Sequence, residues 1–531
     1  DEVVVTGMRV EVARRNMPVN VSVIPREKID EIEESAILPL ISRSVPGVFV
    51  NERGVTGFGR TGGSSAGNIS IRGVGGSPNS QVLVLVDGHP QYMGIFGHPL
   101  PNNYVASDLE RVEIIRGPAS ILYGSNAMGG VLNLITRKQK EDGVSGSMRF
   151  GYGSYNTAKL MTNTGFKKGK WDFFASYNHD ETAGHRENMN FRIDNGYIKA
   201  GYQLAEHIKL SADFNMADMN SLDPGREMDA VDVFQASMVR GKTSVSLLNN
   251  FEKLDGGILA YYNFGEHDFS DGWISNDENY GISLYEGFRP FESTLLTIGI
   301  DHKTYGGRGN AAFPPTYANQ WLTVNETGGY LIAQQSSFRN RLILNGGIRY
   351  DTHSMFGSEW IPQGGVTFHL SNQLSLKSTA SKGFRSPTIM ELYLFAPNQE
   401  LKPEHSNNYD LSLSYRLPQW GLSTELTVFL VRGDNIIQVI PNPAPPPPSK
   451  RFNSGSFEHS GFEWEVKYRS SVGFTADLSY SFLKMDIPKL ASPEHQVFAG
   501  LNYKYGDFRF AFQANYIGGL YVMTAGMEGI N

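Results

Sequence analysis

Short segments in which apolar and polar residues alternate fill most of this chain, and they constrain its fold more than any other feature. From about Gly143 onward, segments of roughly ten residues repeat this pattern. In 409–417 and 507–516 the apolar positions are Tyr409, Leu411, Leu413, Tyr415, Leu417, Phe508, Phe510, Phe512, Ala514 and Tyr516. Alternation with a period of two over about ten residues is typical of strands in a transmembrane β-barrel. We therefore expect the apolar face of each segment, including the even-numbered residues of 507–516, to contact lipid.

The spacing of these segments also fits an antiparallel barrel. We count about 19 candidate strands between 144 and 518. Tight connections such as 167–170 alternate with long polar stretches such as 218–230 and 306–325, which predicts short turns at one end of the barrel and long loops at the other. Because single-chain bacterial barrels normally have an even number of strands, we expect the closing strands to be missing from this sequence.

The first 137 or so residues have a different, mixed α/β pattern. Short apolar runs bounded by Gly, Asp and Pro at 82–86, 111–115 and 131–135 predict strands buried in a small core. Pro25 followed by acidic residues predicts the start of a helix. A second short helix is expected in 35–47, interrupted by Pro39.

Composition excludes several classes of function. The chain has 531 residues and no cysteine, which rules out disulfides, a thiol nucleophile and Cys-ligated metal sites. A net charge of −7 gives no electrostatic footprint for nucleic acid. The motifs HExxH and GxxxxGK[ST] are absent, so we expect neither an enzyme nor a bound cofactor.

Several ordered motifs carry a resemblance to a known family. They are DEVVVTG (1–7), NISIRG (68–73), VLVLVDG (82–88) and LERVEIIRGPASILYGSNAMGGVLNLIT (109–136). Together they resemble the TonB-dependent outer-membrane receptors over essentially the whole chain. The resemblance implies a TonB box at 1–7, a plug domain at 8–140 and a barrel at 141–531 of about 22 strands that encloses the plug.

The resemblance also implies a function, a location and partners. The protein would be an integral barrel in the outer membrane of a Gram-negative bacterium, surrounded by lipid. It would import a scarce metal chelate such as a ferric siderophore, energised by the TonB complex. Cobalamin and haem are alternative solutes, and a surface lipoprotein is a further possible partner. A passive porin-like channel is the alternative from another class, although it would lack the plug and the TonB box.

The TonB box would supply the contact with the energy-transducing complex. Val3, Val4 and Val5 are β-branched and favour extended backbone. Together with Glu2 and Thr6 they form a strand that a partner could capture by β-augmentation.

The family places arginines of the plug against acidic residues of the barrel wall. Arg72 and Arg116 each lie in an Arg-Gly turn of the plug. The alternation of apolar residues places Asp410 and Glu463 on the inward face of the barrel. We therefore predict that these four residues form a latch between plug and barrel. The alternative is a set of lumenal charges that are solvated by water.

A Pro- and Gly-rich stretch at 88–104 follows a predicted plug strand, and in the family such loops touch the solute. His89, Met93 and His98 could face a metal or chelate, since His and Met suit soft or borderline metals. The alternative is a loop in which these side chains merely pack. FRSPT (384–388) and NQELKPE (398–404) resemble a motif pair in which haem-binding members carry an intervening His. This chain has no His between Thr388 and Asn398, which argues against haem.

Overall fold

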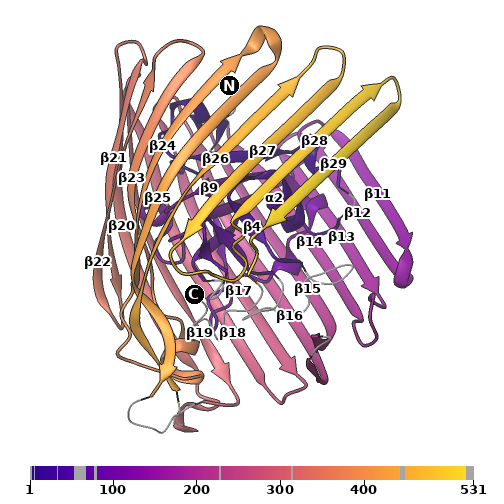
Figure 1. The fold of residues 1–531 in the computed structure, drawn as a ribbon. Coiled ribbons are helices and arrows are strands. Elements are labelled where there is room, and N and C mark those ends of the chain that lie inside the picture. The colour runs from indigo at the N-terminus through magenta and orange to yellow at the C-terminus, as the bar shows by residue number, and fades with distance from the viewer. Residues whose placement is uncertain are drawn as a thin grey trace.

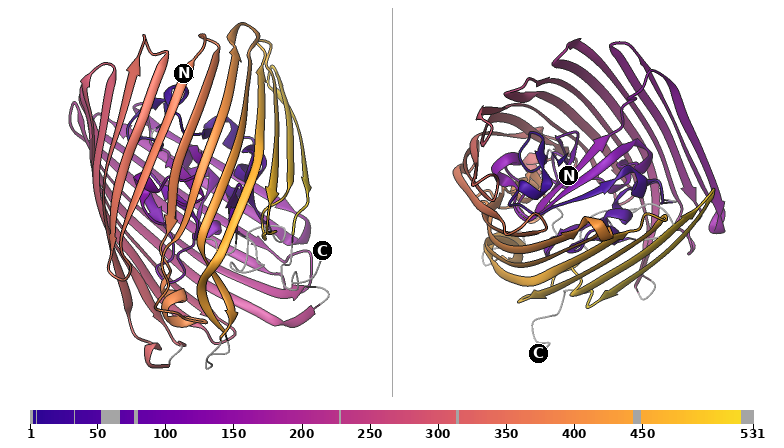
Figure 2. Two further views of the ribbon diagram at one scale, coloured as in Figure 1. Left: turned by 60° about the vertical axis from the view of Figure 1, so that its left-hand side comes forward. Right: turned by 90° about the horizontal axis from the view of Figure 1, so that it is seen from above.

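The structure of the protein is a computed structural model, which describes residues 3–4, 6–32, 34–52, 67–76, 80–226, 229–312, 315–442 and 449–521. A large antiparallel sheet forms a tall curved wall, and the N-terminal part of the chain lies inside it (Figure 1). The view from above shows the N-terminal strands and helices surrounded by the wall (Figure 2). The fold is thus a plug within a β-barrel wall.

The wall is one sheet of 19 described strands, in which each strand pairs antiparallel with its neighbours in sequence. The strands are β11 (Gly143–Gly153), β12 (Thr157–Lys168), β13 (Trp171–Thr182), β14 (Phe191–Ala205), β15 (Ile208–Arg226), β16 (Asp229–Asn250), β17 (Leu254–Phe269), β18 (Ile274–Phe291), β19 (Thr294–Gly309), β20 (Leu322–Ser337), β21 (Leu342–His353), β22 (Gly357–His369), β23 (Leu374–Arg385), β24 (Glu404–Leu417), β25 (Leu422–Pro441), β26 (Ser449–Arg469), β27 (Phe474–Met485), β28 (His495–Tyr505) and β29 (Phe508–Gly518). Among the described strands, β11 and β29 are the two edges of this sheet.

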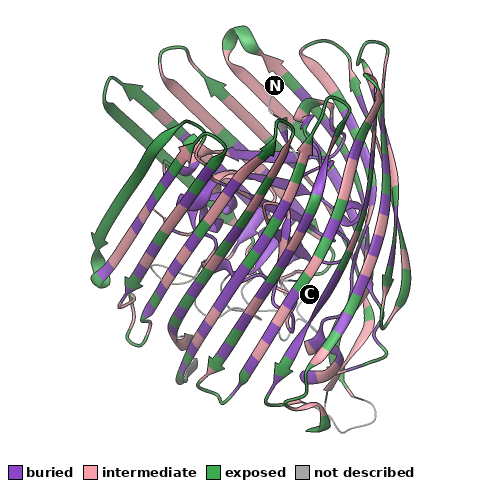
Figure 3. Ribbon diagram, turned by 180° about the vertical axis from the view of Figure 1, so that it is seen from behind, coloured by how far each residue is buried: buried purple, intermediate pink, exposed green. Residues whose placement is uncertain are grey.

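The predicted alternation is visible along the strands. In β24, Tyr409 and Leu411 are about half exposed, whereas Asp410 and Ser412 are buried against the plug. Exposed and buried bands alternate along the strands in the same way (Figure 3). The side chains of strand β29 are exposed on both faces, so their burial does not distinguish the two faces of 507–516.

Some expected loops are instead extensions of the strands. The stretch 218–230 was predicted as a loop, but β15 continues to Arg226 and β16 begins at Asp229. The polar strand ends no longer alternate with apolar residues, which is why the pattern gave no signal for them. The hairpin of β25 and β26 likewise extends far at the bottom of Figure 1, opposite the end at which the N-terminus lies. We call these the long-hairpin end and the N-terminal end of the wall.

The plug is built around a five-stranded mixed sheet with the order β3-β9-β10-β7-β8, in which β10 and β7 are parallel. A three-stranded sheet, a two-stranded sheet and short helices complete it. The strands are β1 (Val3–Val4), β2 (Val12–Ala13), β3 (Val21–Pro25), β4 (Val48–Val50), β5 (Ile69–Ile71), β6 (Val74–Gly75), β7 (Val82–Val86), β8 (His89–Gln91), β9 (Leu109–Arg116) and β10 (Gly130–Thr136). The helices are α1 (Arg26–Ile29), α2 (Leu38–Ser44) and α3 (Ser120–Tyr123), with 3-10 turns at Arg14–Asn16, Pro101–Asn103 and Ala106–Asp108. The wall adds 3-10 turns at Ser154–Asn156, Pro315–Tyr317 and Pro418–Trp420 and a π-helical turn at Met390–Leu394.

The three predicted plug strands are present as β7, β9 and β10, and their apolar side chains are buried. The helices differ in detail from the prediction. Pro39 does not interrupt α2 but lies in its first turn, where its missing N–H is not needed. None of the described helices is long and apolar enough to cross a membrane.

Candidate functional site

The N-terminal segment is folded against the plug rather than left free. Backbone atoms of Val3 and Val4 pair with Ala13 and Val12 in a short antiparallel sheet. Val4 is completely buried. Glu2 and Val5 of the predicted TonB box lie outside the described residues. β-Augmentation requires an exposed strand, and this conformation does not present one. The segment must therefore dissociate from the plug before a partner strand can pair with it.

Thr6 is the residue through which the plug holds this segment. Its backbone N–H and its hydroxyl both donate to Glu113 Oε2, over 2.9 and 2.6 Å. Asn133 Nδ2 donates to the Thr6 hydroxyl over 2.9 Å, and the Tyr123 hydroxyl donates to the Thr6 carbonyl over 2.8 Å. All four residues are buried, so each broken bond would leave a desolvated polar group.

The four residues predicted to form a latch lie together at the interface of plug and wall. The Arg72 guanidinium donates twice to the Glu463 carboxylate, over 2.8 and 2.9 Å, and once to Asp410, over 2.7 Å. Arg116 donates to Glu463 Oε2 over 2.7 Å and lies 3.5 Å from Glu425. We call Arg72, Arg116, Asp410 and Glu463 the latch cluster. Burial acts to lower the pKa of Arg72, but Asp410 and Glu463 raise it above its ordinary value.

The backbone around the latch cluster is shaped to bring these groups close. Arg72 itself adopts a left-handed conformation with a φ of 54°, which is uncommon for a residue with a side chain. At Gly47, whose φ is +76°, a Cβ atom would lie 2.1 Å from Glu463 Oε1. Only glycine fits there, so the turn at Gly47 lets the plug backbone approach the carboxylate.

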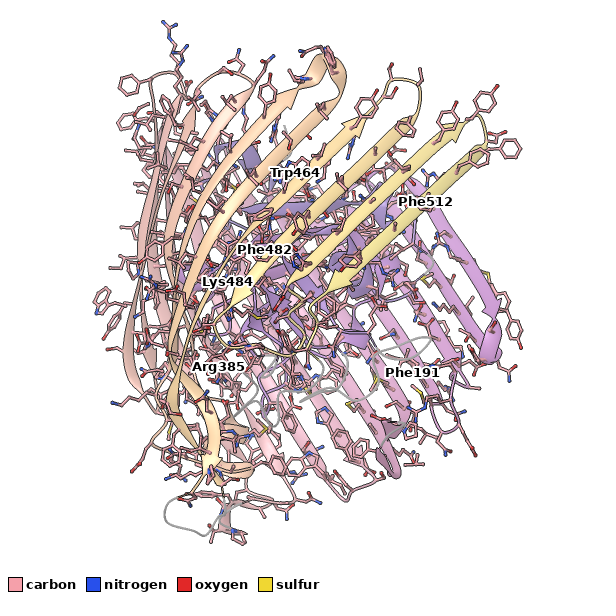
Figure 4. All side chains as sticks on the ribbon, viewed as in Figure 1. Phe191, Arg385, Trp464, Phe482, Lys484 and Phe512 are labelled. Atoms are coloured by element: carbon pink, nitrogen blue, oxygen red, sulfur yellow. The ribbon has the colours of Figure 1, made fainter. Side chains whose placement is uncertain are left out.

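A second set of buried ions joins the plug to the wall, and sequence reasoning missed it. The guanidinium of Arg385 binds Glu404 over 2.6 Å and Glu391 over 2.8 and 3.0 Å. From the plug, Gln81 donates to Glu404 over 2.7 Å, and Ser80 accepts from Arg385 over 3.1 Å. Arg385 lies within FRSPT, so the motif marked the residue without indicating its partners. Figure 4 labels Arg385 in the lower half of the wall, toward the long-hairpin end.

The structure places the three predicted solute ligands in an edge strand of the plug and in the turn that follows it. His89 belongs to strand β8 rather than to a loop. Its Nδ1 bonds the Val86 carbonyl over 3.1 Å, and its Nε2 lies 3.4 Å from the Ser246 hydroxyl. Met93 is buried, and its backbone forms a tight turn with His98. Within the described residues, no group of three or more His, Asp or Glu side chains is arranged to hold a metal ion.

Burial favours the neutral form of both histidines. Burial, followed by the nearby charge of Lys242, lowers the pKa of His89 to about 4. Burial also lowers the pKa of His98, although the Pro99 carbonyl acts in the opposite direction. A neutral imidazole can accept a hydrogen bond or coordinate a metal, but these two side chains are used within the protein.

The tip of the plug meets an aromatic surface at the long-hairpin end. Ile95 is fully buried in a cluster with Trp273 and Leu394. The Phe96 ring lies 6.2 Å from Trp273 and 5.8 Å from His98, measured between ring centroids. Partly buried members of this cluster include Phe269, Met390 and Tyr393. We call the plug turn 93–98 and these side chains the aromatic mouth.

One short plug segment contacts both the aromatic mouth and the N-terminal segment. Tyr123, at the end of α3, donates to Thr6, and the Arg9 guanidinium lies 4.1 Å from the centre of its ring. Three residues later, Asn126 donates to the Gly97 carbonyl over 3.2 Å. Ser125 accepts a bond from the Ser386 N–H over 2.9 Å. Hydrogen bonds of this segment therefore connect the plug turn at the mouth with Thr6.

Comparisons with known proteins agree with this architecture. The family model described as TonB dependent receptor-like, beta-barrel, matches residues 128–528. The model described as TonB-dependent Receptor Plug Domain matches residues 13–131.

Individual relatives and solved structures are similar over most of the chain. A vitamin B12 transporter, BtuB, from Photobacterium profundum is 25% identical, over 91% of this chain and 78% of its own. An iron-regulated outer membrane virulence protein from Vibrio cholerae is 26% identical, over 96% of this chain and 82% of its own. The siderophore receptor PirA from Pseudomonas aeruginosa has a TM-score of 0.75 at 20% identity, covering 94% of this chain and 91% of its own. With both its plug and its wall matched in order, the chain belongs to the family of TonB-dependent outer-membrane receptors.

Proposed function

We propose that this receptor imports a scarce metal chelate, such as a ferric siderophore, and that the TonB complex drives the import by pulling on residues 2–6. The observation that carries this proposal is the segment 119–126. It bonds Thr6 through Tyr123 and the aromatic mouth through Asn126. Occupation of the mouth can thus loosen the N-terminal segment, which must leave the plug before a partner strand can pair with it.

The proposed latch holds the plug while no solute is bound. Removing one partner of a buried ion pair destabilises a protein by about 3–5 kcal/mol, because the other charge is left buried and unpaired. Arg72 and Glu463 are each about 1% exposed, so the latch cluster meets that condition. The latch cluster therefore favours a closed resting state that opens only when work is done on the plug.

The class of solute follows from the chemistry of the mouth. Phe96, Phe269 and Tyr393 are partly exposed around the buried Trp273 and offer aromatic surface that suits the organic shell of a chelate. The relatives support two solute classes, since one is named an iron-regulated protein and another a vitamin B12 transporter. We place the ferric chelate first and cobalamin second. Haem ranks third because 388–398 holds no His.

A passive channel is the competing class. A plug that fills the lumen and is held by buried ion pairs argues for gated import. The outward apolar side chains, among them Tyr409 and Leu411, suit the lipid of an outer membrane. The contact with a surface lipoprotein stays a prediction.

Uptake of labelled ferric siderophores, cyanocobalamin and haem by whole cells tests the proposal. Cells would carry the intact receptor, a receptor lacking residues 2–6, or a Glu11→Ala control in an exposed residue of the same segment. We expect uptake of one solute that the deletion and a protonophore both abolish, while the control retains it. Uptake that is indifferent to the deletion would overturn energised import and favour a passive channel.

A further inference from the structure

An open groove crosses the wall at the long-hairpin end, on strands other than those of the latch cluster. Its volume is about 520 Å³, and the ends of β13 to β16 form most of it. This volume lies within the range that holds small organic molecules, roughly 300–1,000 Å³. Phe191, which lines it, is labelled toward the same end of the wall as Arg385 in Figure 4. We call it the rim groove.

The rim groove opens on the outer face of the wall, away from the plug. The backbone of a row of paired residues forms its floor, and the side chains of this row are buried on the inner face: Thr182, Phe191 and Ser221. The adjacent row also lines the groove and consists of Glu181, Arg192 and Asn220. These three residues are exposed, as alternation along a strand requires when the row before it points inward.

The groove lies beyond the band of the wall that faces hydrocarbon. Tyr177 and Met216 are outward residues of one row, each 42% exposed, and they precede Glu181 and Asn220 by four residues on the same strands. Four residues span about 14 Å along a strand and about 10 Å along the membrane normal at a tilt near 45°. Phospholipid head groups add only roughly 5–8 Å to each side of the hydrocarbon core. A lipid that fills the groove must therefore have a longer head group.

The charges near the groove disfavour a phosphate group. Asp194 and Asp218 form the outward row between Tyr177 and the groove, and Glu181 lines the groove itself. Arg192, the cation in the lining, is held by the Asp194 carboxylate over 2.8 and 3.0 Å. Because the remaining charges are acidic, the site repels an anion and suits a neutral ligand.

Amide side chains give the groove its hydrogen-bonding character. Asn156, Asn190, Asn220 and Gln235 line it. The Gln235 amide donates to Asn220 Oδ1 over 3.2 Å, which fixes these two side chains next to each other. A carboxamide offers both donors and an acceptor, and a hydroxyl group also donates and accepts, so the two match. The four strands span about 14 Å at about 4.8 Å between neighbours, which is long enough for a short chain of sugar rings.

A strained turn holds an exposed aromatic ring beside these amides. Tyr155 and Asn156 have φ values of 62° and 52°, which are uncommon for residues with a side chain. The Ala183 N–H donates to the Tyr155 carbonyl over 2.8 Å, and the Tyr152 hydroxyl donates to Asn156 Oδ1 over 3.1 Å. The Tyr155 ring is 51% exposed. Its electron-rich face suits the C–H groups on one side of a sugar ring.

We propose that the rim groove binds the sugar chain of a glycolipid in the outer leaflet of the membrane. A free oligosaccharide has the same chemistry, but the position of the groove next to the lipid-facing band favours a sugar that is linked to lipid. Arg186 already joins the β13–β14 hairpin to the β15–β16 hairpin by donating to the Gly225 carbonyl over 2.9 Å. The bound sugar would fix this pair of hairpins to the leaflet. The inference does not rest on the proposed import function.

Binding to the purified receptor in detergent tests the proposal. The probes are lipopolysaccharide, lipid A, which lacks the outer sugar chain, and the core oligosaccharide freed from lipid, each titrated by native mass spectrometry with and without EDTA. The test variant combines Asn220→Ala with Gln235→Ala. The control is Asn325→Ala, because Asn325 is an exposed amide of β20 at the same end and accepts a bond from Thr304 over 2.7 Å.

We expect lipopolysaccharide to bind at least about tenfold more tightly than lipid A, with or without EDTA. The test variant should lose about tenfold in affinity, since each lost hydrogen bond weakens binding a few-fold, and the control should lose none. Equal affinity for lipid A, or loss of binding in EDTA, would overturn the proposal in favour of a phosphate contact. Free oligosaccharide that binds as tightly as lipopolysaccharide would overturn the lipid-linked source. Unchanged affinity in the test variant would exclude the rim groove.

Hydrogen exchange supplies a second measurement. Lipopolysaccharide should slow exchange in 181–192 and 218–223 of the native receptor, because the bound sugar orders these strand ends. The same lipid should have no such effect on the test variant. Equal protection in both proteins, or protection confined to other strands, would refute the assignment of the site.

Discussion

Glu463→Gln should release the plug from the wall without altering the wall itself. Glu463 is 1% exposed and accepts two bonds from Arg72 and one from Arg116. An amide of the same size keeps the packing but removes the charge, which leaves two buried guanidinium groups with Asp410 and Glu425 as their acidic neighbours. Breaking a buried pair by removing one partner costs about 3–5 kcal/mol. The equilibrium between docked and loosened plug should therefore shift by about two to four orders of magnitude.

The assay is hydrogen exchange of the plug in purified receptor, together with ion conductance in planar lipid bilayers. We expect faster exchange in residues 69–76, which contain Arg72, and more frequent open events. Glu458→Gln is a sharp control because it lies on the same strand and also pairs with an arginine, Arg432, over 2.7 Å. Both partners of that pair are more than half exposed, so its loss should cost at most about 1 kcal/mol. Equal effects of the two substitutions would refute the reasoning, since burial would then not set the strength of the latch cluster.

Three further predictions concern the plug. Thr6→Val removes one hydroxyl from the bonds with Glu113 and Asn133, so the N-terminal segment should loosen by about 1–3 kcal/mol and crosslink more readily to TonB; unchanged crosslinking would contradict it. His89 has a pKa lowered to about 4, below its ordinary 6.5, so the unfolded state binds more protons and stability should fall as pH drops from about 6.5 to 4. His89→Asn should reduce this change in stability with pH by up to about 3 kcal/mol. Hydrogen exchange of strand β8 measures the effect. A pH profile as steep as that of the native protein would exclude His89 as its source. Gly94→Ala places a Cβ 2.2 Å from the Glu278 carbonyl oxygen, so the plug turn must shift at a cost of about 1–3 kcal/mol. We expect faster hydrogen exchange in 90–98 and weaker solute binding. An unaltered exchange pattern would contradict this prediction.

Much of the wall was predictable because a lipid-facing strand obeys a strict rule. Every second side chain must be apolar where the strand crosses the bilayer, so the number of strands and the inward face of Asp410 could both be inferred. The rule ends where the strands leave the bilayer, and the predicted loop at 218–230 was wrong for that reason.

Partners across the interface were harder to predict than faces. Alternation indicates that Arg240 points inward, but not that Asp277 meets it. Nor does it indicate that Asp277 holds the plug at Gly94 and Arg240 holds it at Tyr92. The two contacts with the plug join residues more than 140 positions apart in the chain and depend on how the plug is turned inside the wall. The latch cluster was predicted only because the family resemblance supplied the pairing that the local pattern lacks.

The same limit explains why His89 was misplaced as a loop residue. Its neighbours Pro90 and Gly88 suggest a turn, yet Val84, Leu85 and Val86 pair with Gln91, Pro90 and His89 in a tight hairpin. Pro90 is tolerated because β8 is an edge of the plug sheet, where one N–H is not required. The hairpin leaves Tyr92 at the wall, where its carbonyl accepts a hydrogen bond from Arg240 over 3.4 Å. Asn263 of the wall bonds this hairpin twice, donating to the Pro90 carbonyl over 2.8 Å and accepting from the Gln91 amide over 3.4 Å. No local pattern in either segment indicates a partner more than 170 positions away, so only the assembled fold shows where β8 lies.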